Sequence, residues 1–161
     1  MILPGVGAFG AAIEELQSKG IYEVVRDWLL ADKPFLGICL GMQILFERSE
    51  ESEGVEGFGL FEGDVLRFKE HKVPQIGWNQ VWITRKSRIM EGIEDGSFFY
   101  FLHGYFVAPR NEDIVVGITE YGVSYPSVIE MNNVCAVQFH PEKSGVVGLK
   151  LLENWVRTCW P

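Results

Sequence analysis

Apolar and polar residues follow two different periods along this chain, and together they predict an α/β fold. Residues 11–18 and 21–31 carry apolar positions at helical spacing. Pro34 then precedes a continuous apolar run at 35–39, which is typical of a buried strand. Met1-Ile2-Leu3 has the pattern of the end of another strand. The succession of strand, glycine loop, helix, strand and helix indicates a parallel sheet covered by helices.

The elements after residue 39 follow from the same two periods. Asn132-Asn133 suits a tight turn with positive φ, so the strands on either side of it predict a hairpin. The predicted set is a helix at 40–48, an acidic solvated loop at 49–59, short strands between 58 and 84, strands at 98–102, 114–120, 127–131 and 134–139, and a helix at 145–158. No repeat or linker divides the chain, so we expect one domain over residues 1–161.

The composition excludes several classes of protein. Hydrophobic residues make up 47% and charged residues 22% of the 161 positions, as in an ordinary globular domain with a sizeable core. Fourteen basic and 22 acidic residues leave a net charge of −8, which argues against broad contact with nucleic acid or an anionic membrane. The three cysteines lack CxxC spacing, and the chain shows neither a signal peptide nor an apolar run of roughly 18 residues. We therefore expect a cytoplasmic protein.

Cys39 lies where the apolar run turns into a helical pattern, within Gly37-Ile38-Cys39-Leu40-Gly41-Met42-Gln43. A side chain displayed on a sharp strand-to-helix turn needs small neighbours, and Gly37 and Gly41 supply them. The first amides of the following helix would favour a thiolate and lower the pKa of the Cys39 thiol. These features predict a cysteine nucleophile, and the alternative is a buried cysteine at the end of a strand.

A cysteine nucleophile needs a base and a group that orients the base, and His140 and Glu142 are the candidates. His140 directly follows a predicted strand. If that strand runs parallel to the strand of Cys39, both residues lie at the carboxyl edge of the sheet, where ligands bind in such folds. Glu142 is two positions on and can hold one tautomer of the imidazole. Cys39, His140 and Glu142 are therefore predicted to form a catalytic triad, and the alternative is a strand-end histidine beside a solvated glutamate.

The other two histidines differ in their surroundings. His71 lies in a charged stretch and is expected to be exposed. His103, in Leu102-His103-Gly104-Tyr105, follows another predicted strand and is a candidate for lining a pocket. A metal site built from Cys39, His140 and Glu142 is conceivable, but no paired cysteines or HExxH spacing supports it. We predict no metal and no cofactor.

Attack of a thiol on a carbonyl carbon also requires hydrogen-bond donors for the oxyanion. The glycines of Pro4-Gly5-Val6-Gly7 let backbone N–H groups point into a cleft. The N–H of Leu40, directly after the nucleophile, is a second natural donor. Two donors and a triad predict acyl transfer, and the alternative for the glycine loop is an ordinary strand-to-helix turn.

Five ordered motifs resemble those of one protein family over essentially the whole chain. Pro4-Gly5-Val6-Gly7-Ala8-Phe9-Gly10, the Cys39 elbow and Gln138-Phe139-His140-Pro141-Glu142 resemble the triad-type (class I) glutamine amidotransferases. Pro74-Gln75-Ile76-Gly77-Trp78-Asn79 and Lys143-Ser144 are similar to segments of the glutaminase subunits of imidazole glycerol phosphate synthases. The resemblance implies a three-layer, mostly parallel central sheet with flanking helices and a small antiparallel portion.

The resemblance also implies a reaction. Cys39 would attack the side-chain amide of L-glutamine, and His140, oriented by Glu142, would protonate the departing ammonia. Water would hydrolyse the γ-glutamyl thioester to glutamate. Ammonia would pass to a (β/α)8-barrel cyclase subunit, which forms imidazole glycerol phosphate in histidine biosynthesis. The other implied residues are an oxyanion and substrate site at Gly5, Val6, Gly7, Leu40, Gln43, His103, Gly104 and Tyr105, and a partner contact at Trp78, Asn79 and Lys143.

Two features depart from the family pattern. Family members usually begin with a strand, a helix and a second strand before the position of Met1, so we expect the chain to be N-terminally truncated relative to the family. Gly104 stands where the family usually has Ser or Thr, which removes a hydroxyl but leaves backbone contacts to glutamine open. The alternatives are a glutaminase of another triad-type amidotransferase, such as that of pyridoxal phosphate synthesis, and an inactive scaffold subunit. The Ile76-Gly77-Trp78-Asn79 segment speaks against the former.

Overall fold

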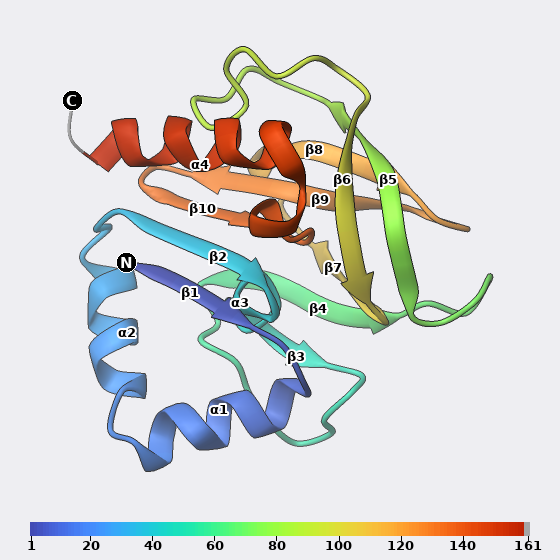
Figure 1. The fold of residues 1–161 in the computed structure, drawn as a ribbon. Helices are drawn as coiled ribbons and strands as arrows, with labels where there is room; N and C mark the ends of the chain where they lie inside the picture. The colour runs from blue at the N-terminus through green and yellow to red at the C-terminus, as the bar shows by residue number, and fades with distance from the viewer. Residues whose placement is uncertain (160–161) are drawn as a thin grey trace.

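Ten strands and four helices make up the described part of the chain, residues 1–159, in a computed structural model (Figure 1). The N-terminal elements are β1 (Ile2–Gly5), α1 (Phe9–Ser18), α2 (Tyr22–Leu30), β2 (Phe35–Cys39), α3 (Leu40–Gln43) and β3 (Phe46–Ser49). The middle of the chain forms β4 (Phe61–Arg67), β5 (Gln75–Ile83), β6 (Ser97–His103) and β7 (Tyr105–Pro109). The last elements are β8 (Val115–Glu120), β9 (Ser124–Met131), β10 (Val134–Val137) and α4 (Gly145–Cys159), with short 3-10 turns at Glu112–Ile114 and Pro141–Lys143.

Seven strands form a mixed sheet in the order β1-β2-β10-β9-β8-β5-β6, and β3, β4 and β7 form a second sheet. β1 and β10 both pair parallel to β2, so that Gly5 lies opposite Cys39 and Val137 lies opposite Ile38. The other neighbours in the large sheet are antiparallel. Because β1, β2 and β10 run the same way, the glycine loop, Cys39 and His140 all follow strands that end at one edge of the sheet.

Helices cover the two faces of the large sheet (Figure 1). Alternate residues of a strand point to opposite faces, and β2 shows this directly. Leu36 and Ile38 pack in one hydrophobic cluster with Leu151 and Trp155 of α4. Phe35 packs in the other cluster, which contains the buried residues of α1 and α2 and of the small sheet. The three-layer arrangement predicted from the sequence is therefore confirmed.

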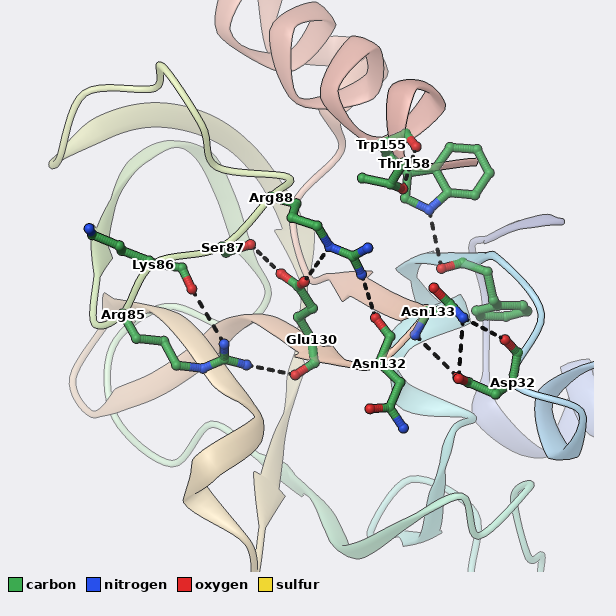
Figure 2. Close-up of polar contacts among 11 residues, drawn as sticks. Asp32, Arg85, Lys86, Ser87, Arg88, Glu130, Asn132, Asn133, Trp155 and Thr158 are labelled. Atoms are coloured by element: carbon green, nitrogen blue, oxygen red, sulfur yellow. Dashed lines mark hydrogen bonds and ion pairs between the residues drawn. The ribbon is translucent and has the colours of Figure 1, made fainter. Parts of the chain in front are cut away.

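Polar contacts close the edge of the sheet that lies opposite the glycine loop (Figure 2). The buried carboxylate of Glu130 on β9 accepts hydrogen bonds from the Ser87 hydroxyl and, at 3.4 Å, from Nε of Arg88. In the β9–β10 turn, the backbone N–H of Asn133 donates to the Asp32 carboxylate at 3.1 Å. This last contact ties the hairpin to the loop before β2, so it supports the register in which β2 and β10 run side by side.

Most of the predicted elements are confirmed. β2 has the predicted bounds, and the α1, α2 and α4 helices lie where the helical spacing placed them. The hairpin of β9 and β10 turns at Asn132, which has φ 53° as the residue type suggested. The parallel pairing of β2 and β10 is also confirmed, and it carries the prediction that Cys39 and His140 share an edge.

Two predictions about elements are wrong, and one strand was missed. The large sheet is mixed and not mostly parallel, because β1–β2 and β2–β10 are its only parallel pairs within residues 1–159; the parallel pair β3–β4 belongs to the small sheet. β7 was not predicted, since its ladder with β4 joins segments that are far apart in sequence. The helix expected at 40–48 ends at Gln43. The carbonyls of Ile44, Leu45 and Phe46 accept hydrogen bonds from residues 58–61, which draws this apolar run into β3 and away from a helix.

The acidic loop predicted at 49–59 has a structural role besides contact with solvent. Its Glu51 carboxylate accepts a hydrogen bond from the backbone N–H of Phe9 at 2.7 Å, and the Ser52 hydroxyl accepts one from Gly10 at 2.9 Å. These are two of the unpaired amides at the start of α1, and a carboxylate is favoured there by the helix dipole. The loop therefore caps α1 beside the glycine loop.

Candidate active site

Close backbone contacts hold the elbow at Cys39. Cys39 has φ 54° and ψ −107°, a conformation that a residue with a side chain adopts only where its surroundings force it. A Cβ atom at Gly37 would lie 2.5 Å from the carbonyl oxygen of Gly41, and a Cβ atom at Gly41 would lie 1.8 Å from that of Leu3. The two glycines therefore allow β1, β2 and α3 to approach closely enough to form the turn, as the sequence predicts.

A cavity of about 420 Å³ opens beside the elbow, a size suited to a small-molecule site. The predicted residues that line it are Val6, Gly7, Cys39, Leu40, Gln43, His103, Gly104 and Tyr105. Gly5 is not among the lining residues. It packs against Leu40, where a Cβ atom would lie 3.1 Å from the leucine Cβ. Hollows of about 590 and 640 Å³ elsewhere on the molecule include no residue of the predicted triad.

The Cys39 thiol is buried and lies among polar groups. The Nε2 amide of Gln138 donates to Sγ at 3.6 Å, and the thiol donates to the carbonyl of Leu102 at 3.7 Å. Burial raises the pKa of Cys39 to about 11, although hydrogen bonds from the Leu40 backbone and Gln138 act in the opposite direction. The expectation of a lowered pKa is therefore wrong. The following helix has only four residues, and its few amides are outweighed by the loss of water around the sulfur.

His140 and Glu142 form the predicted pair. Nδ1 of His140 lies 2.7 Å from Oε1 of Glu142, and because a carboxylate only accepts hydrogen bonds, Nδ1 carries the proton. Nε2 is then the basic nitrogen. Within residues 1–159 this buried atom has no hydrogen-bond partner, so it is not bonded to Sγ of Cys39 in this conformation. With the proton of the neutral ring on Nδ1, Nε2 is left as a hydrogen-bond acceptor.

Backbone contacts fix the position of His140. Its N–H donates to the carbonyl of Tyr100 on β6 at 2.9 Å. The hydroxyl of Ser144 donates to the His140 carbonyl at 2.6 Å and accepts from the Tyr100 N–H at 2.9 Å. The turn that carries His140 is thus held to β6 from both sides.

One wall of the cavity is a hydrogen-bonded group of side chains. Nε2 of Gln43 donates to the carbonyl of Tyr105 at 3.0 Å and to Oε1 of Gln138 at 3.2 Å. Nδ1 of His103 lies 2.7 Å from the same Tyr105 carbonyl, and burial lowers the pKa of His103 to about 4. His103 is therefore a neutral, positioned part of the wall, whereas His71 is exposed as predicted.

The glycine loop and the Leu40 amide border the cavity from the other side. Gly7 adopts φ 108°, and Val6 is 73% exposed, so this loop presents backbone to the cavity and not a buried side chain. Leu40 directly follows Cys39, and both residues line the cavity. The predicted oxyanion donors thus lie next to the nucleophile, and their role stays a prediction.

The three predicted partner-contact residues do not all lie together. Trp78 is exposed and meets the ring of Tyr100 edge-on, with centroids 6.1 Å apart. Nζ of Lys143 lies 6.0 Å from the centroid of the same ring. Asn79 instead donates to the carbonyl of Glu120 at 2.9 Å. Trp78 and Lys143 therefore flank Tyr100, and Asn79 points elsewhere.

Sequence reasoning missed three polar residues of the site, besides the lining residues Val73, Pro74 and Leu102. Gln138 was seen only as part of the His140 motif, and its side chain contacts the nucleophile. Glu51 and Arg67 line the cavity and are its charged side chains. Nothing in the sequence distinguishes these two from the other charged residues, because β4 and the loop after β3 reach the elbow only through tertiary folding.

Residues 1–159 contain no group of three or more His, Cys, Asp or Glu side chains arranged to hold a metal ion. In the same part of the chain, every helix is too short or too polar to cross a membrane.

Comparisons with known proteins agree with this geometry. Residues 1–159 match the model of the family described as glutamine amidotransferase class-I. The chain is 54% identical over 159 residues to the imidazole glycerol phosphate synthase subunit HisH of Methanocaldococcus jannaschii, a match covering 97% of this chain and 79% of the relative. It is 51% identical over 162 residues to the subunit of the same name from Thermococcus kodakarensis, covering 98% and 82%.

Solved structures share the fold at low sequence identity. A crystal structure described as a glutamine amidotransferase superposes with a TM-score of 0.71 at 20% identity, covering 96% of this chain and 78% of its own. PurLQS from Thermotoga maritima superposes with a TM-score of 0.70 at 18% identity, covering 98% and 79%. These two likenesses concern the fold alone, and they confirm the predicted fold family.

Replacing Gly41 is expected to disrupt the elbow. In Gly41→Ala the new Cβ would meet the Leu3 carbonyl, and backbone cannot move aside as a flexible side chain can. We expect a loss of about 3 kcal/mol or more in the free energy of unfolding, measured by urea denaturation. Gly104→Ala is the control, because its Cβ would lie 3.3 Å from a terminal methyl of Val73 and 3.9 Å from Cβ of Pro74 and would meet no backbone, and we expect it to cost less than about 1 kcal/mol. Equal urea midpoints for Gly41→Ala and the unchanged chain would contradict the steric account of the elbow.

The raised pKa predicts how fast Cys39 reacts with iodoacetamide. With a pKa of about 11, the thiolate fraction falls tenfold for each pH unit below that value, so alkylation is expected to accelerate about tenfold per unit from pH 7 to pH 10. Peptide mass spectrometry would follow each cysteine separately. Partly exposed Cys159 should be accessible to reagent first, and Cys135, with a pKa raised to about 12, should react last. A plateau in the Cys39 rate near pH 7 would show that the thiolate is already formed in the free protein.

Proposed function

This chain belongs to the glutamine amidotransferase class-I family, and we propose that within it the chain is the glutaminase subunit of an imidazole glycerol phosphate synthase, active in histidine biosynthesis. Members of this family are enzymes that hydrolyse glutamine. The observation that carries the assignment is the parallel pairing of β2 and β10, which brings the Cys39 elbow and the His140–Glu142 pair to one edge of the sheet. The high identity to two subunits of that synthase supports the choice of pathway.

The proposed reaction begins with a proton transfer. Because the Cys39 thiol is neutral at pH 7, the sulfur becomes nucleophilic only as Nε2 of His140 takes its proton. Sγ then bonds to the carbonyl carbon of the glutamine side-chain amide. The negative charge moves to the amide oxygen, where the N–H of Leu40 and backbone amides of Val6 and Gly7 would stabilise it. The imidazolium returns its proton to the amide nitrogen, and ammonia leaves as the C–N bond breaks.

The second half of the reaction uses water. The thioester carbon is attacked by a water molecule that loses a proton to Nε2 of His140. Collapse of this intermediate breaks the C–S bond, and the proton returns to sulfur, which restores the thiol and releases glutamate. Glu142 keeps Nδ1 protonated throughout, so Nε2 remains the reacting nitrogen in both steps.

Charged residues of the cavity suit the ends of the substrate. L-Glutamine carries an α-ammonium and an α-carboxylate, and Glu51 and Arg67 line the cavity with the opposite charges. We infer that Glu51 pairs with the ammonium and Arg67 with the carboxylate. Gln43 and the backbone of 103–105 then form the wall against which the side chain of glutamine lies.

The proposed partner is a (β/α)8-barrel cyclase subunit that receives the ammonia, in a cytoplasmic heterodimer. The surface proposed to meet it is formed by Ile76, Trp78 and Phe98, which are 60%, 56% and 52% exposed, together with Lys143 beside Tyr100. Trp78 pairs across the strands with Tyr100, and Ile76 and Phe98 belong to the same two strands, β5 and β6. An exposed aromatic patch with a flanking cation is typical of a protein–protein interface.

The proposed activity is tested by ammonia release from L-glutamine, measured with the cyclase subunit present. Cys39→Ala is expected to lower kcat by at least about 10³-fold, because no other group replaces the nucleophile. Glu142→Gln is expected to lower kcat by about 10²-fold or more through loss of the oriented imidazole. Cys135→Ala, which changes an equally buried cysteine outside the cavity, is the control and should stay within about threefold. Retained activity in Cys39→Ala would overturn the mechanism.

The proposed interface is tested by titrating the chain with the cyclase. We expect glutamine hydrolysis to be weak for the chain alone and to rise on complex formation. Trp78→Ala should raise the Kd of the complex at least about tenfold, since large aromatic side chains dominate such interfaces. Leu30→Ala removes another exposed apolar side chain, 71% exposed at the end of α2, and should leave the Kd unchanged. Equal effects of the two substitutions, or full activity without the cyclase, would contradict the proposed coupling.

A further inference from the structure

A line of buried, hydrogen-bonded polar groups runs from the Tyr105 carbonyl in the cavity wall through His103 and Tyr125 to Gln75 on β5. The proposed reaction assigns no role to Tyr125 or Gln75. Nδ1 of His103 donates to the Tyr105 carbonyl at 2.7 Å, and its Nε2 lies 3.2 Å from the hydroxyl of Tyr125 on β9. The same hydroxyl lies 2.8 Å from Oε1 of Gln75, the first residue of β5. Gln75, His103 and Tyr125 are all buried.

The protons along this line can be assigned by donor and acceptor chemistry. A carbonyl oxygen only accepts, so Nδ1 of His103 must carry a proton. Since burial lowers the pKa of His103 to about 4, the ring is neutral near pH 7 and holds a single N–H. Nε2 therefore has no proton and can only accept, which leaves the Tyr125 hydroxyl as its donor.

The Tyr125 hydroxyl has one proton and two acceptors. It lies between Nε2 of His103 and Oε1 of Gln75, so it satisfies only one of them at a time. Meanwhile Nε2 of Gln75 is buried and has no hydrogen-bond partner among residues 1–159. Rotation of the Gln75 side-chain amide by 180° exchanges its oxygen and nitrogen. The amide N–H would then donate to the Tyr125 oxygen, and the Tyr125 hydroxyl would donate to Nε2 of His103, so both groups would be satisfied. The line thus has two arrangements, distinguished by the Gln75 amide and the direction of the hydroxyl.

The near end of the line reaches the reacting groups. The Tyr105 carbonyl accepts from His103 and also from Nε2 of Gln43, which lines the cavity with Cys39. Gln43 in turn bonds to Gln138, whose amide donates to the Cys39 sulfur. At the far end, Gln75 directly precedes the exposed Ile76.

We propose that Tyr125 is a positioning residue that acts through His103 to fix the Tyr105 carbonyl and the Gln43 amide for glutamine, and that Gln75 decides whether its hydroxyl serves His103. This inference rests on the proposed glutaminase function. It gives β5 a direct polar connection to the substrate wall, by discrete hydrogen bonds with two alternative directions.

A purely structural role for Tyr125 is the competing explanation. Its ring packs edge-on or tilted against Phe68, Phe101 and Phe106, and this packing is independent of the hydroxyl. Tyr125→Phe keeps the ring and removes only the oxygen. Tyr121→Phe is the matched control, because Tyr121 also packs on Phe68 but its hydroxyl donates to the Lys72 carbonyl, outside the line.

Kinetics of the complex with the cyclase separate the two explanations. We expect Tyr125→Phe to raise the KM for glutamine about three- to tenfold, the effect of losing one net hydrogen bond in the wall, with kcat changed less than about threefold. Tyr121→Phe should leave both constants unchanged. An unchanged KM in Tyr125→Phe, or a loss confined to kcat with a lowered Tm, would overturn the proposal.

Substitution of Gln75 gives a test with opposite signs. Gln75→Met removes the competing acceptor, so the hydroxyl is left to His103 and the KM is expected to stay within about twofold of the unchanged chain or to fall. Once ionised, the carboxylate in Gln75→Glu can only accept, so it holds the hydroxyl away from His103, and the KM should rise as in Tyr125→Phe at a pH above the pKa that burial raises for this carboxyl group. Equal KM values for Gln75→Met and Gln75→Glu would contradict the role assigned to the amide.

Nitrogen NMR of the histidines tests the line without any activity. The chain has three histidines, so His103→Gln assigns the His103 signals. We expect the Nδ1–H tautomer for His103, with an Nε2 shift that moves toward that of an unbonded nitrogen in Tyr125→Phe. An Nε2–H tautomer in the unchanged chain would overturn the proposal even if a variant failed to fold. A chain with this tautomer but without glutaminase activity would instead count against the proposed function.

Discussion

The close passage of backbone at the Cys39 elbow is the constraint on which the candidate site depends. Strand β2 can end in a residue with φ 54° only because Gly37 and Gly41 leave room for neighbouring carbonyls. Because Gly41 has no side chain, α3 also packs closely against β1, and this places Leu40 beside the glycine loop. The nucleophile and its predicted oxyanion donors therefore come from one packing arrangement, in which strain at a single residue is offset by the parallel ladder on both sides.

Burial of the thiol changes how the nucleophile is activated. A cysteine whose pKa lies near 11 is protonated in the free protein, so its reactivity must be gained when a proton acceptor and a substrate are both in place. Nε2 of His140 is an acceptor nitrogen with no hydrogen-bond partner among residues 1–159, and Glu142 keeps the opposite nitrogen protonated. The same exclusion of water that keeps the sulfur neutral strengthens hydrogen bonds to a developing oxyanion. In the proposed reaction, protection of the thiol and stabilisation of the charged intermediate are thus two consequences of one environment.

Local sequence patterns predicted the parts of the site whose chemistry is local. The elbow could be recognised because glycines flank Cys39, and the base could be recognised because His140 and Glu142 lie two positions apart after a strand. The end of the helix at Gln43 and the strand β7 could not be recognised from the sequence, because both depend on hydrogen bonds between segments that are far apart in the chain. The prediction of a lowered pKa for Cys39 was wrong for the same reason. Helix polarity can be read from neighbouring residues, but burial depends on the whole fold.

The N-terminal end of β5 connects two functions over a short distance. Val73 and Pro74 line the cavity, Gln75 belongs to the buried line of polar groups, and Ile76 and Trp78 are exposed on the surface proposed for the partner. Gln75, Ile76 and Trp78 lie on one strand that is paired with β6, and Pro74 directly precedes that strand. If the proposed partner contacts Ile76 and Trp78, the route from that surface to the cavity wall is only a few residues of one strand, and no long pathway through the core is needed for the partner to influence where glutamine lies.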